Sequence, residues 1–355
     1  MTLVYGFMCF SAIASIAMHF RERAAQALER FRSSNSLRKL LLSSLTAPLI
    51  VGCGFGGGGF DGVDAQRAKP FQRYDLVQAI ASNGVTVVAA SQAGSVIVSD
   101  DQGRAWRRHA IGGGMVDLAT CPDGRFVGID FQGRGWVGDS KGQQWDSIAL
   151  SEPVPAISAA CDTRGRWWVT GAHAQVAMSP DFGATWTLID LSRDADDAQL
   201  TSIQMVDESH GFIVGEFGFV FGTTDGGENW THIGTIDGDF YPYAVAFVSR
   251  EEGFASGLAG QVVRTTDGGV SWAPVPNVTG VSFYRLVRAG NEVFGVGGGG
   301  VVARLSESGV TPVAYPDAMP VPLTSVASLG PDRQALVVGG PGGFSRVVST
   351  EEAGS

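Results

Sequence analysis

The stretch Thr223-Thr224-Asp225-Gly226-Gly227-Glu228-Asn229-Trp230 follows the pattern Ser/Thr-x-Asp-x-Gly-x-x-Trp. The same pattern occurs at residues 99–106, 179–186 and 265–272. Residues 138–145 keep only the Gly and the Trp of the pattern, and residues 305–309 form a degenerate copy that lacks the Trp. The five tryptophans are 39, 41, 44 and 42 residues apart. A repeat at such a steady period predicts that the chain is built from copies of one supersecondary unit.

The residue types of this motif suit a tight turn. An Asp side chain accepts backbone N–H groups, and Ser or Thr does so more weakly. Gly provides the positive φ that the turn requires, and Trp at the start of the next strand buries a large ring. We therefore interpret the motif residues as structural rather than catalytic. They are Ser99, Asp101, Gly103, Trp106, Ser179, Asp181, Gly183, Trp186, Thr223, Asp225, Gly227, Trp230, Thr265, Asp267, Gly269 and Trp272.

Short apolar segments surround each motif. Two precede it, as at residues 85–90 and 95–98, one carries the Trp, and another opens the next unit, as at residues 115–119. Four short strands in about forty residues are typical of a β-propeller blade. The sequence thus predicts an all-β, seven-bladed β-propeller of four-stranded antiparallel blades, with a six-bladed ring as the alternative.

The seventh blade is incomplete in the sequence. Its three predicted strands lie at residues 325–328, 335–338 and 345–349. Residues 70–74 resemble the start of a fourth strand, so we expect them to supply the outer strand of this blade. One N-terminal and three C-terminal strands would then close the ring and hide its sheet edges.

Composition agrees with this fold and excludes some functions. Of 355 residues, 50 are Gly, and only 17% are charged, which suits many short strands and turns. The formal net charge of −10 argues against a nucleic-acid partner, which requires a basic surface.

The N-terminal 53 residues differ from the rest. Arg38 and Lys39 precede an apolar run at residues 40–51, which is followed by Gly52 and Cys53. This order is typical of a secretory signal, and its end resembles a bacterial lipobox in which Cys53 is lipidated. The alternative is a membrane anchor at residues 1–20 plus a second apolar segment. We expect a protein on the periplasmic side of a bacterial membrane, lipid-anchored, with the outer membrane favoured.

These features divide the chain into four parts. Residues 1–53 form the predicted targeting segment, residues 54–69 a flexible tether, residues 70–350 the propeller and residues 351–355 a tail. Within the propeller, Cys121 and Cys161 follow corresponding strands of consecutive repeats. A disulfide in an oxidising periplasm is one interpretation. Two buried free thiols are the alternative, which we favour because sequence alone does not show that the residues approach.

The motifs resemble Asp-box (BNR) repeats, and the fuller unit at residues 214–230 resembles the photosystem II stability/assembly factor family. The resemblance extends over residues 70–350. It implies a propeller that is not an enzyme but a chaperone, as in phototrophs, where family members in the thylakoid lumen hold a membrane-protein assembly intermediate. Those members carry a basic surface patch, whereas this chain is acidic.

Asp-boxes also occur in sialidases, so a glycan-binding or sialidase-like glycoside hydrolase is the alternative function. A sialidase needs an arginine triad, and the predicted inner strands of blades one to five contain no Arg. Glycoside hydrolysis needs paired carboxylates, and the inner strands offer only Asp117 and Asp207, near strand ends. The five His residues show no ligand spacing. We therefore expect no enzyme activity, no metal and no cofactor.

What remains is a binding surface. In propellers, the loops between blades share one face with the turns between second and third strands, opposite the Asp-box turns. Aromatic side chains with a few charges suit a protein interface, although they would equally plug the mouth of the channel. The candidate residues for binding a protein partner in the cell envelope are Arg134, His173, Glu216, Phe217, Phe240, Tyr241, Tyr243, Tyr284 and Arg285.

Overall fold

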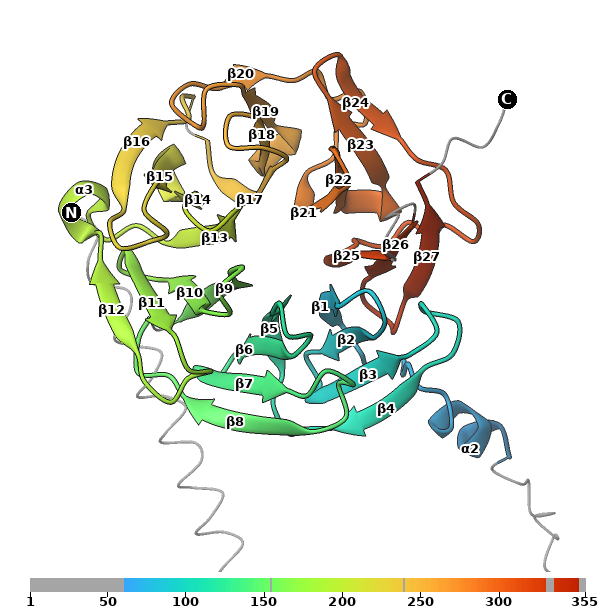
Figure 1. Ribbon diagram of the computed structural model, residues 1–355. Helices are drawn as coiled ribbons and strands as arrows, with labels where there is room; N and C mark the ends of the chain where they lie inside the picture. The colour runs from blue at the N-terminus through green and yellow to red at the C-terminus, as the bar shows by residue number, and fades with distance from the viewer. Residues whose placement is uncertain (1–60, 154, 239, 330–334, 351–355) are drawn as a thin grey trace, which may run out of the picture. The chain divides into compact units, whose positions relative to one another are not determined.

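The computed structural model describes residues 61–153, 155–238, 240–329 and 335–350. These residues form seven antiparallel sheets arranged in a ring (Figure 1). Six sheets have four strands each and the seventh has three. The prediction of an all-β, seven-bladed propeller is confirmed, and the six-bladed alternative is wrong.

Each blade consists of consecutive strands, numbered from the centre of the ring outward. Blades one to three contain β1 (Val77–Ser82), β2 (Val87–Ser91), β3 (Ser95–Ser99), β4 (Arg107–Ala110), β5 (Met115–Thr120), β6 (Phe126–Asp130), β7 (Arg134–Gly138), β8 (Trp145–Ala149), β9 (Ala156–Cys161), β10 (Trp167–Gly171), β11 (Gln175–Ser179) and β12 (Thr187–Asp190). Blades four and five contain β13 (Leu200–Met205), β14 (Gly211–Gly215), β15 (Phe219–Thr223), β16 (Thr231–Thr235), β17 (Pro242–Phe247), β18 (Gly253–Gly257), β19 (Val262–Thr265) and β20 (Ala273–Pro274). Blades six and seven contain β21 (Phe283–Ala289), β22 (Glu292–Gly297), β23 (Val302–Ser306), β24 (Gly309–Pro312), β25 (Ser325–Leu329), β26 (Ala335–Gly339) and β27 (Ser345–Ser349).

Within the described ranges, helical structure is limited to short segments. The helix α2 (Asp61–Arg67) precedes the propeller, and α3 (Ser192–Ala195) follows β12. Three single 3-10 turns, η1 (Glu216–Gly218), η2 (Leu258–Gly260) and η3 (Gly298–Gly300), join the second and third strands of blades four to six. None of the described helices has the length and apolar character needed to span a bilayer.

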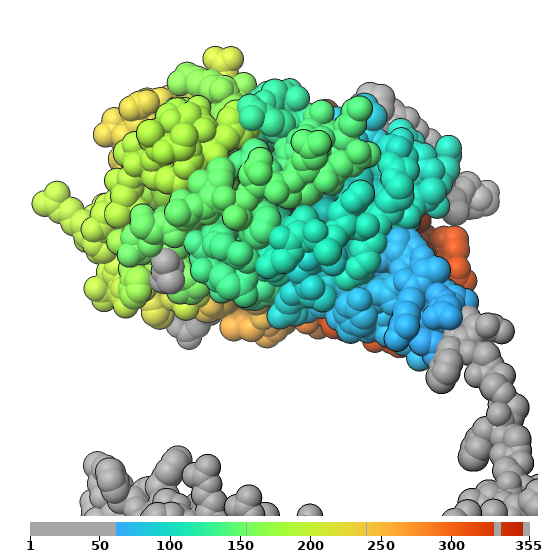
Figure 2. Space-filling view, turned by 90° about the horizontal axis from the view of Figure 1, so that it is seen from below, coloured from blue at the N-terminus to red at the C-terminus, as the bar shows by residue number. Residues whose placement is uncertain are grey.

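The hydrophobic core lies between the blades. Seven clusters of buried side chains each join two neighbouring blades, such as the one that packs Trp168 of blade three against Trp230 of blade four. Because strands alternate their side chains between two faces, each sheet contributes to the cluster on either side. From the rim, the outer surfaces of the first three blades follow one another without a gap (Figure 2).

The ring closes differently from our prediction. Residues 70–74 form bends and turns, not a strand, so the expectation that they complete blade seven is wrong. The adjacent Asp75 instead binds the guanidinium of Arg108 on β4 at 2.7 and 3.0 Å, and its carbonyl accepts from the backbone N–H of Gly343 in blade seven at 2.9 Å, so this segment contacts both blades. Closure rests on the contact between β1 and β25, where Ser325 Oγ donates to the carbonyl of Val77 at 2.8 Å.

A disulfide joins blades two and three. Cys121 directly follows β5 and Cys161 ends β9, and their Cα atoms are 5.0 Å apart. The structure therefore selects the disulfide over the free thiols that we favoured. The two inner strands lie side by side in the ring, a proximity that the sequence separation of 40 residues conceals.

Candidate functional site

The four full Asp-box motifs share one hydrogen-bond pattern. The Ser or Thr hydroxyl donates to the Asp carboxylate at 2.8–2.9 Å and accepts from the backbone N–H of the motif Gly at 2.7–2.9 Å. In the fourth blade, Asp225 also accepts from the backbone N–H of Asn229 at 3.0 Å. Hydrogen bonds from Asn229 and Thr223 lower the pKa of Asp225 to about 2. Because these carboxylates accept hydrogen bonds from the residues of their own turn, they are poorly suited to acid/base chemistry.

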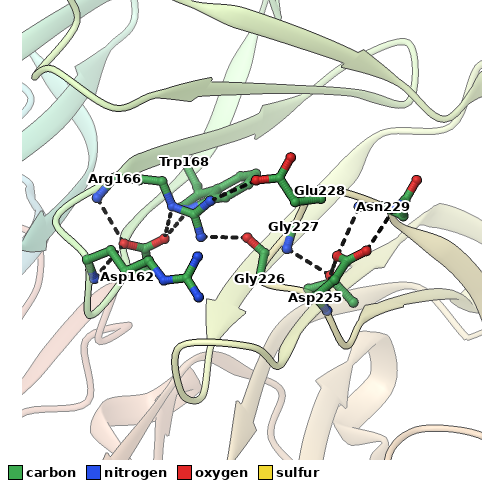
Figure 3. Close-up of polar contacts among 10 residues, drawn as sticks. Asp162, Arg166, Trp168, Asp225, Gly226, Gly227, Glu228 and Asn229 are labelled. Atoms are coloured by element: carbon green, nitrogen blue, oxygen red, sulfur yellow. Dashed lines mark hydrogen bonds and ion pairs between the residues drawn. The ribbon is translucent and has the colours of Figure 1, made fainter.

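The motif Gly lies where the turn meets the preceding blade. At Gly227, φ is +87° and an added Cβ would lie 2.3 Å from the Trp168 ring on blade three. Arg166 crosses the same boundary, because its Nε donates to Asp162 at 2.7 Å and its Nη2 to the carbonyl of Gly226 at 2.5 Å (Figure 3). The indole N–H of Trp168 also donates to Asp162, at 3.0 Å. This group holds blade four against blade three.

Sequence reasoning missed this Asp–Arg–Trp group, although it occurs twice. Residues 130–136 and 162–168 share the spacing Asp-x-x-Gly-Arg-x-Trp. In both, the Arg Nε donates to the Asp at 2.7 Å, and the Trp indole donates to the same oxygen. The shared spacing is the signal that could have identified it. One consequence is that Arg134, expected on the binding face, is paired with the buried Asp130.

Four of the residues predicted for the binding face form one cluster over blades four to six. They are Glu216, Tyr241, Tyr243 and Tyr284. The rings of Tyr241 and Tyr243 have centroids 6.3 Å apart, and those of Tyr243 and Tyr284 5.5 Å apart, both edge to face. Burial, followed by the negative charge of Glu216 and a hydrogen bond to it, raises the pKa of Tyr241. Arg285 follows Tyr284 on β21 and, with Tyr243, lines the central cavity. We call the face that carries the inter-blade loops and the turns between second and third strands the loop face.

Phe217 stands out on the loop face because its backbone is strained and its ring is exposed. It lies in η1 with φ +61° and is 70% exposed. The corresponding turns of blades five and six have Ala259 and Gly299 at φ +55° and +63°. The left-handed conformation costs an L-residue roughly 1–2 kcal/mol, and an exposed ring recovers little of that through packing. Since smaller residues suffice in the same turn, this Phe indicates a surface role.

The two remaining predicted residues differ from each other. His173, in the turn between β10 and β11, is exposed, and its ring contacts Asp197 in the next inter-blade loop. That contact raises the pKa of His173. Phe240 is only 2% exposed and packs with Val214 and Phe247 in the core between blades four and five. Its place on the binding face is therefore a wrong prediction: the large apolar ring fills the core at the base of its loop.

Further exposed apolar side chains on this face were not predicted. Large apolar residues are exposed in turns or inter-blade loops of the loop face at Phe131, Phe217, Leu258, Val278 and Met319. The turns of the opposite face, which carries the Asp-boxes, expose only Val85 and Val270 among the described residues. The signal in the sequence is a large apolar residue inside a turn, as in Asp130-Phe131-Gln132-Gly133. Exposed apolar surface gathered on one face marks an interaction site.

Charge is unevenly distributed around the ring. Residues 115–241, which form blades two to four, contain 19 acidic and 6 basic residues. Residues 242–350 contain seven of each. The acidity of the propeller is thus a property of one side, and a partner that approaches that side would be attracted by basic groups.

The central cavity, of about 240 Å³, is lined by inner strands of the ring. Asp117 is the only carboxylate in the described lining, and it accepts from Ser158 Oγ at 3.1 Å and from the backbone N–H of Ala159 at 2.9 Å. Hydrolysis of a glycoside needs a second carboxylate. The other candidate, Asp207, is paired with Arg250 at 2.6 Å. Nowhere in the described ranges do three His, Cys, Asp or Glu side chains gather as a metal site would require.

No curated protein sequence matches the chain at a significant level. Residues 137–238 match the family model described as photosynthesis system II assembly factor YCF48. The match runs from β7 to the end of blade four and confirms the resemblance that the Asp-box units indicated.

Solved structures show the same fold. YCF48 from Cyanidioschyzon merolae has 14% identity and a TM-score of 0.63, over 79% of this chain and 97% of that one. A structure of YCF48 bound to D1 peptide has 13% identity and a TM-score of 0.61, over 79% and 95%. Virginiamycin B lyase from Staphylococcus aureus has 11% identity and a TM-score of 0.64, over 78% and 95%. At these identities, the likeness concerns the fold alone.

Proposed function

We propose that this chain is a non-enzymatic propeller that holds a protein partner on its loop face while a membrane or periplasmic complex of the cell envelope assembles. The observation that carries the proposal is Phe217, a strained and exposed aromatic side chain at a position where blades five and six use Ala and Gly. An unfavourable backbone conformation at an exposed residue is explained if the side chain of that residue contacts another molecule.

The surroundings of Phe217 support a protein as the partner. The tyrosine cluster and the exposed apolar residues of neighbouring loops add the aromatic and apolar area that interface centres use. The family match over residues 137–238 supports the same role, since YCF48 is described as an assembly factor and one YCF48 structure contains a D1 peptide. The acidic side formed by blades two to four favours a partner with basic groups nearby.

We further propose that the protein is exported and tethered by lipid at Cys53, with the outer membrane as its site. Cys53 lies outside the described residues, so this rests on the lipobox-like sequence. The disulfide between Cys121 and Cys161 supports an oxidising compartment such as the periplasm. Palmitate labelling of the native chain should be lost in Cys53→Ala, and label that survives this substitution contradicts the anchor.

The partner role is tested by cross-linking in native membranes, using Phe217→Gly. Removing the ring should reduce the yield of a discrete cross-linked partner. The same substitution should leave the free energy of unfolding unchanged or raise it by up to about 1 kcal/mol, because Gly adopts φ +61° without strain but has more freedom when unfolded.

The matched control is Val85→Ser, which removes an exposed apolar side chain from the opposite face. It should leave the cross-linked yield unchanged. Equal yields from the native chain and Phe217→Gly would refute the binding role of this turn. A yield that falls together with stability would mean that Phe217 serves the fold instead.

A further inference from the structure

The inner strands place one layer of equivalent residues in the central cavity. In blades one to six, the residue that follows the break in register of the inner strand lines this cavity. These residues are Ala79, Asp117, Ser158, Ser202, Ala244 and Arg285, and blade seven adds Ser325. Five of the seven are Ala or Ser, which leaves space in the layer, whereas Asp117 and Arg285 bring opposite charges into it.

The two charged residues of this layer belong to blades on different sides of the ring. Asp117 lies on β5 of blade two and Arg285 on β21 of blade six (Figure 1). Two blades separate them in one direction around the ring and three in the other. A small molecule in the cavity can therefore have one end at Asp117 and the other at Arg285.

Arg285 provides a positive charge that no neighbouring carboxylate neutralises. Among the described acidic side chains, none forms an ion pair with Arg285, and its Nη1 donates to the carbonyl of Tyr284 at 3.3 Å. Arg288 of the same strand also lines the cavity, so the formal charge of the described lining is +1 in a chain whose net charge is −10. A guanidinium in such a position favours an anion, and its planar fork matches a carboxylate.

The backbone beside Arg285 adds a hydrogen-bond donor. In blade three, the backbone N–H of Ala159 donates to Asp117 of the preceding blade at 2.9 Å. The equivalent N–H of blade six is that of Leu286, which directly follows Arg285 and also lines the cavity. The preceding blade has Ala244 at the position of Asp117, and Ala offers no side-chain acceptor. The wall at blade six is therefore suited to an acceptor group such as a carboxylate.

Asp117 provides an acceptor at blade two. Its hydrogen bonds from Ser158 Oγ, at 3.1 Å, and from the backbone N–H of Ala159 both go to the carboxylate oxygen Oδ2. The other oxygen, Oδ1, accepts no hydrogen bond from the described residues. Oδ1 can therefore accept from a donor group of a bound molecule, and a charged ammonium gives the stronger bond to a carboxylate.

We propose that the central cavity binds a small amino acid, with its carboxylate at Arg285 and its ammonium group at Asp117. The cavity volume of about 240 Å³ is below that of pockets for drug-sized ligands, which begin near 300 Å³, and suits a molecule of this size. This site does not rest on the proposed function. The Phe217→Gly substitution should leave amino-acid affinity unchanged, and Arg285→Gln should leave the yield of the cross-linked partner unchanged.

Isothermal titration calorimetry of the purified full chain tests the proposal. The probes are glycine, β-alanine, 4-aminobutyrate and 5-aminopentanoate, in which the distance between ammonium and carboxylate increases stepwise. The probe whose length matches the separation of Asp117 and Arg285 should bind most tightly. The acid of the same length without the amine, such as butyrate for 4-aminobutyrate, should bind about tenfold more weakly because it cannot donate to Asp117.

Two substitutions test the two ends of the ligand separately. Arg285→Gln should weaken binding of the preferred amino acid and of its amine-free acid, both by about 10- to 100-fold. Asp117→Asn keeps an acceptor for the N–H of Ala159 but removes the charge. It should weaken binding of the amino acid about tenfold and change the affinity for the amine-free acid by less than about twofold. Arg193→Gln, which changes an exposed Arg on α3, is the matched control and should leave all affinities unchanged.

Three outcomes would overturn the proposal. The first is that none of the four amino acids binds at concentrations up to about 10 mM. The second is that Arg285→Gln binds them as tightly as the native chain, which would place the binding site elsewhere. The third is that amino acids and amine-free acids bind equally well. If Asp117→Asn fails to fold, Arg285→Gln and the paired probes still decide between these results.

Discussion

Substitution of the Asp-box glycine in blade four should reveal how tightly that turn is packed on the preceding blade. Gly227→Ala places a methyl group where an added Cβ would lie 2.3 Å from the Trp168 ring. Trp168 is fully buried, and its indole N–H is bonded to Asp162, so the ring has little freedom to move aside. The backbone contributes separately, because φ at this position is +87°.

Gly84→Ala separates the two effects. Gly84 lies in the turn between β1 and β2 at φ +88°, and an added Cβ there meets nothing within 4 Å. Both substitutions therefore incur the cost of the left-handed backbone, roughly 1–2 kcal/mol for an L-residue. Only Gly227→Ala adds overpacking, which costs about 1–3 kcal/mol in a well-packed core. We expect the free energy of unfolding to fall by about 1–3 kcal/mol more in Gly227→Ala than in Gly84→Ala.

The assay is equilibrium urea unfolding of both variants and the native chain, followed by tryptophan fluorescence and circular dichroism. Coincident transitions by the two probes are required, since the comparison assumes cooperative unfolding. If the two variants lose the same free energy, to within about 0.5 kcal/mol, contact between the Asp-box turn and the preceding blade is not what requires Gly at this position. Such a result would refute the reasoning that the turn locks adjacent blades.

Two further predictions concern stability. Replacing Cys121 and Cys161 by Ser opens a loop of 40 residues and should cost about 4 kcal/mol in urea unfolding; reductant should destabilise the native chain and leave the double variant unaffected. Burial raises the pKa of Asp75, but hydrogen bonds from Arg108, Gln72 and Ser91 and the charge of Arg108 together lower it below its ordinary value. The ionised Asp75 therefore contributes fully to the free energy of unfolding above about pH 4, and this contribution is lost as the pH falls through the lower pKa of the folded state. Asp75→Asn should lower the free energy of unfolding by about 3 kcal/mol near pH 7, and its stability should fall less steeply at acid pH than that of the native chain. If the stabilities of the two proteins fall in parallel as the pH is lowered, the prediction is wrong.

The sequence determined much of the architecture, because the relevant signals are local. Turn chemistry within eight residues places the Asp-box, and its period of about forty residues counts the blades. The three strands of blade seven lie where the apolar segments indicated, at residues 325–329, 335–339 and 345–349. Local patterns succeed here because each turn satisfies its own backbone groups without help from distant segments.

Only the tertiary structure decided which residues meet across blades and which remain exposed. Residues 70–74 were predicted as a strand, but they form bends and turns, and the adjacent buried Asp75 binds both Arg108 of blade one and Gly343 of blade seven. Phe217 and Phe240 look equally suited to a binding face, yet one is exposed and the other buried, since burial depends on the neighbouring blade. The disulfide has the same origin. It joins segments that are 40 residues apart in the sequence, and no local pattern encodes that proximity.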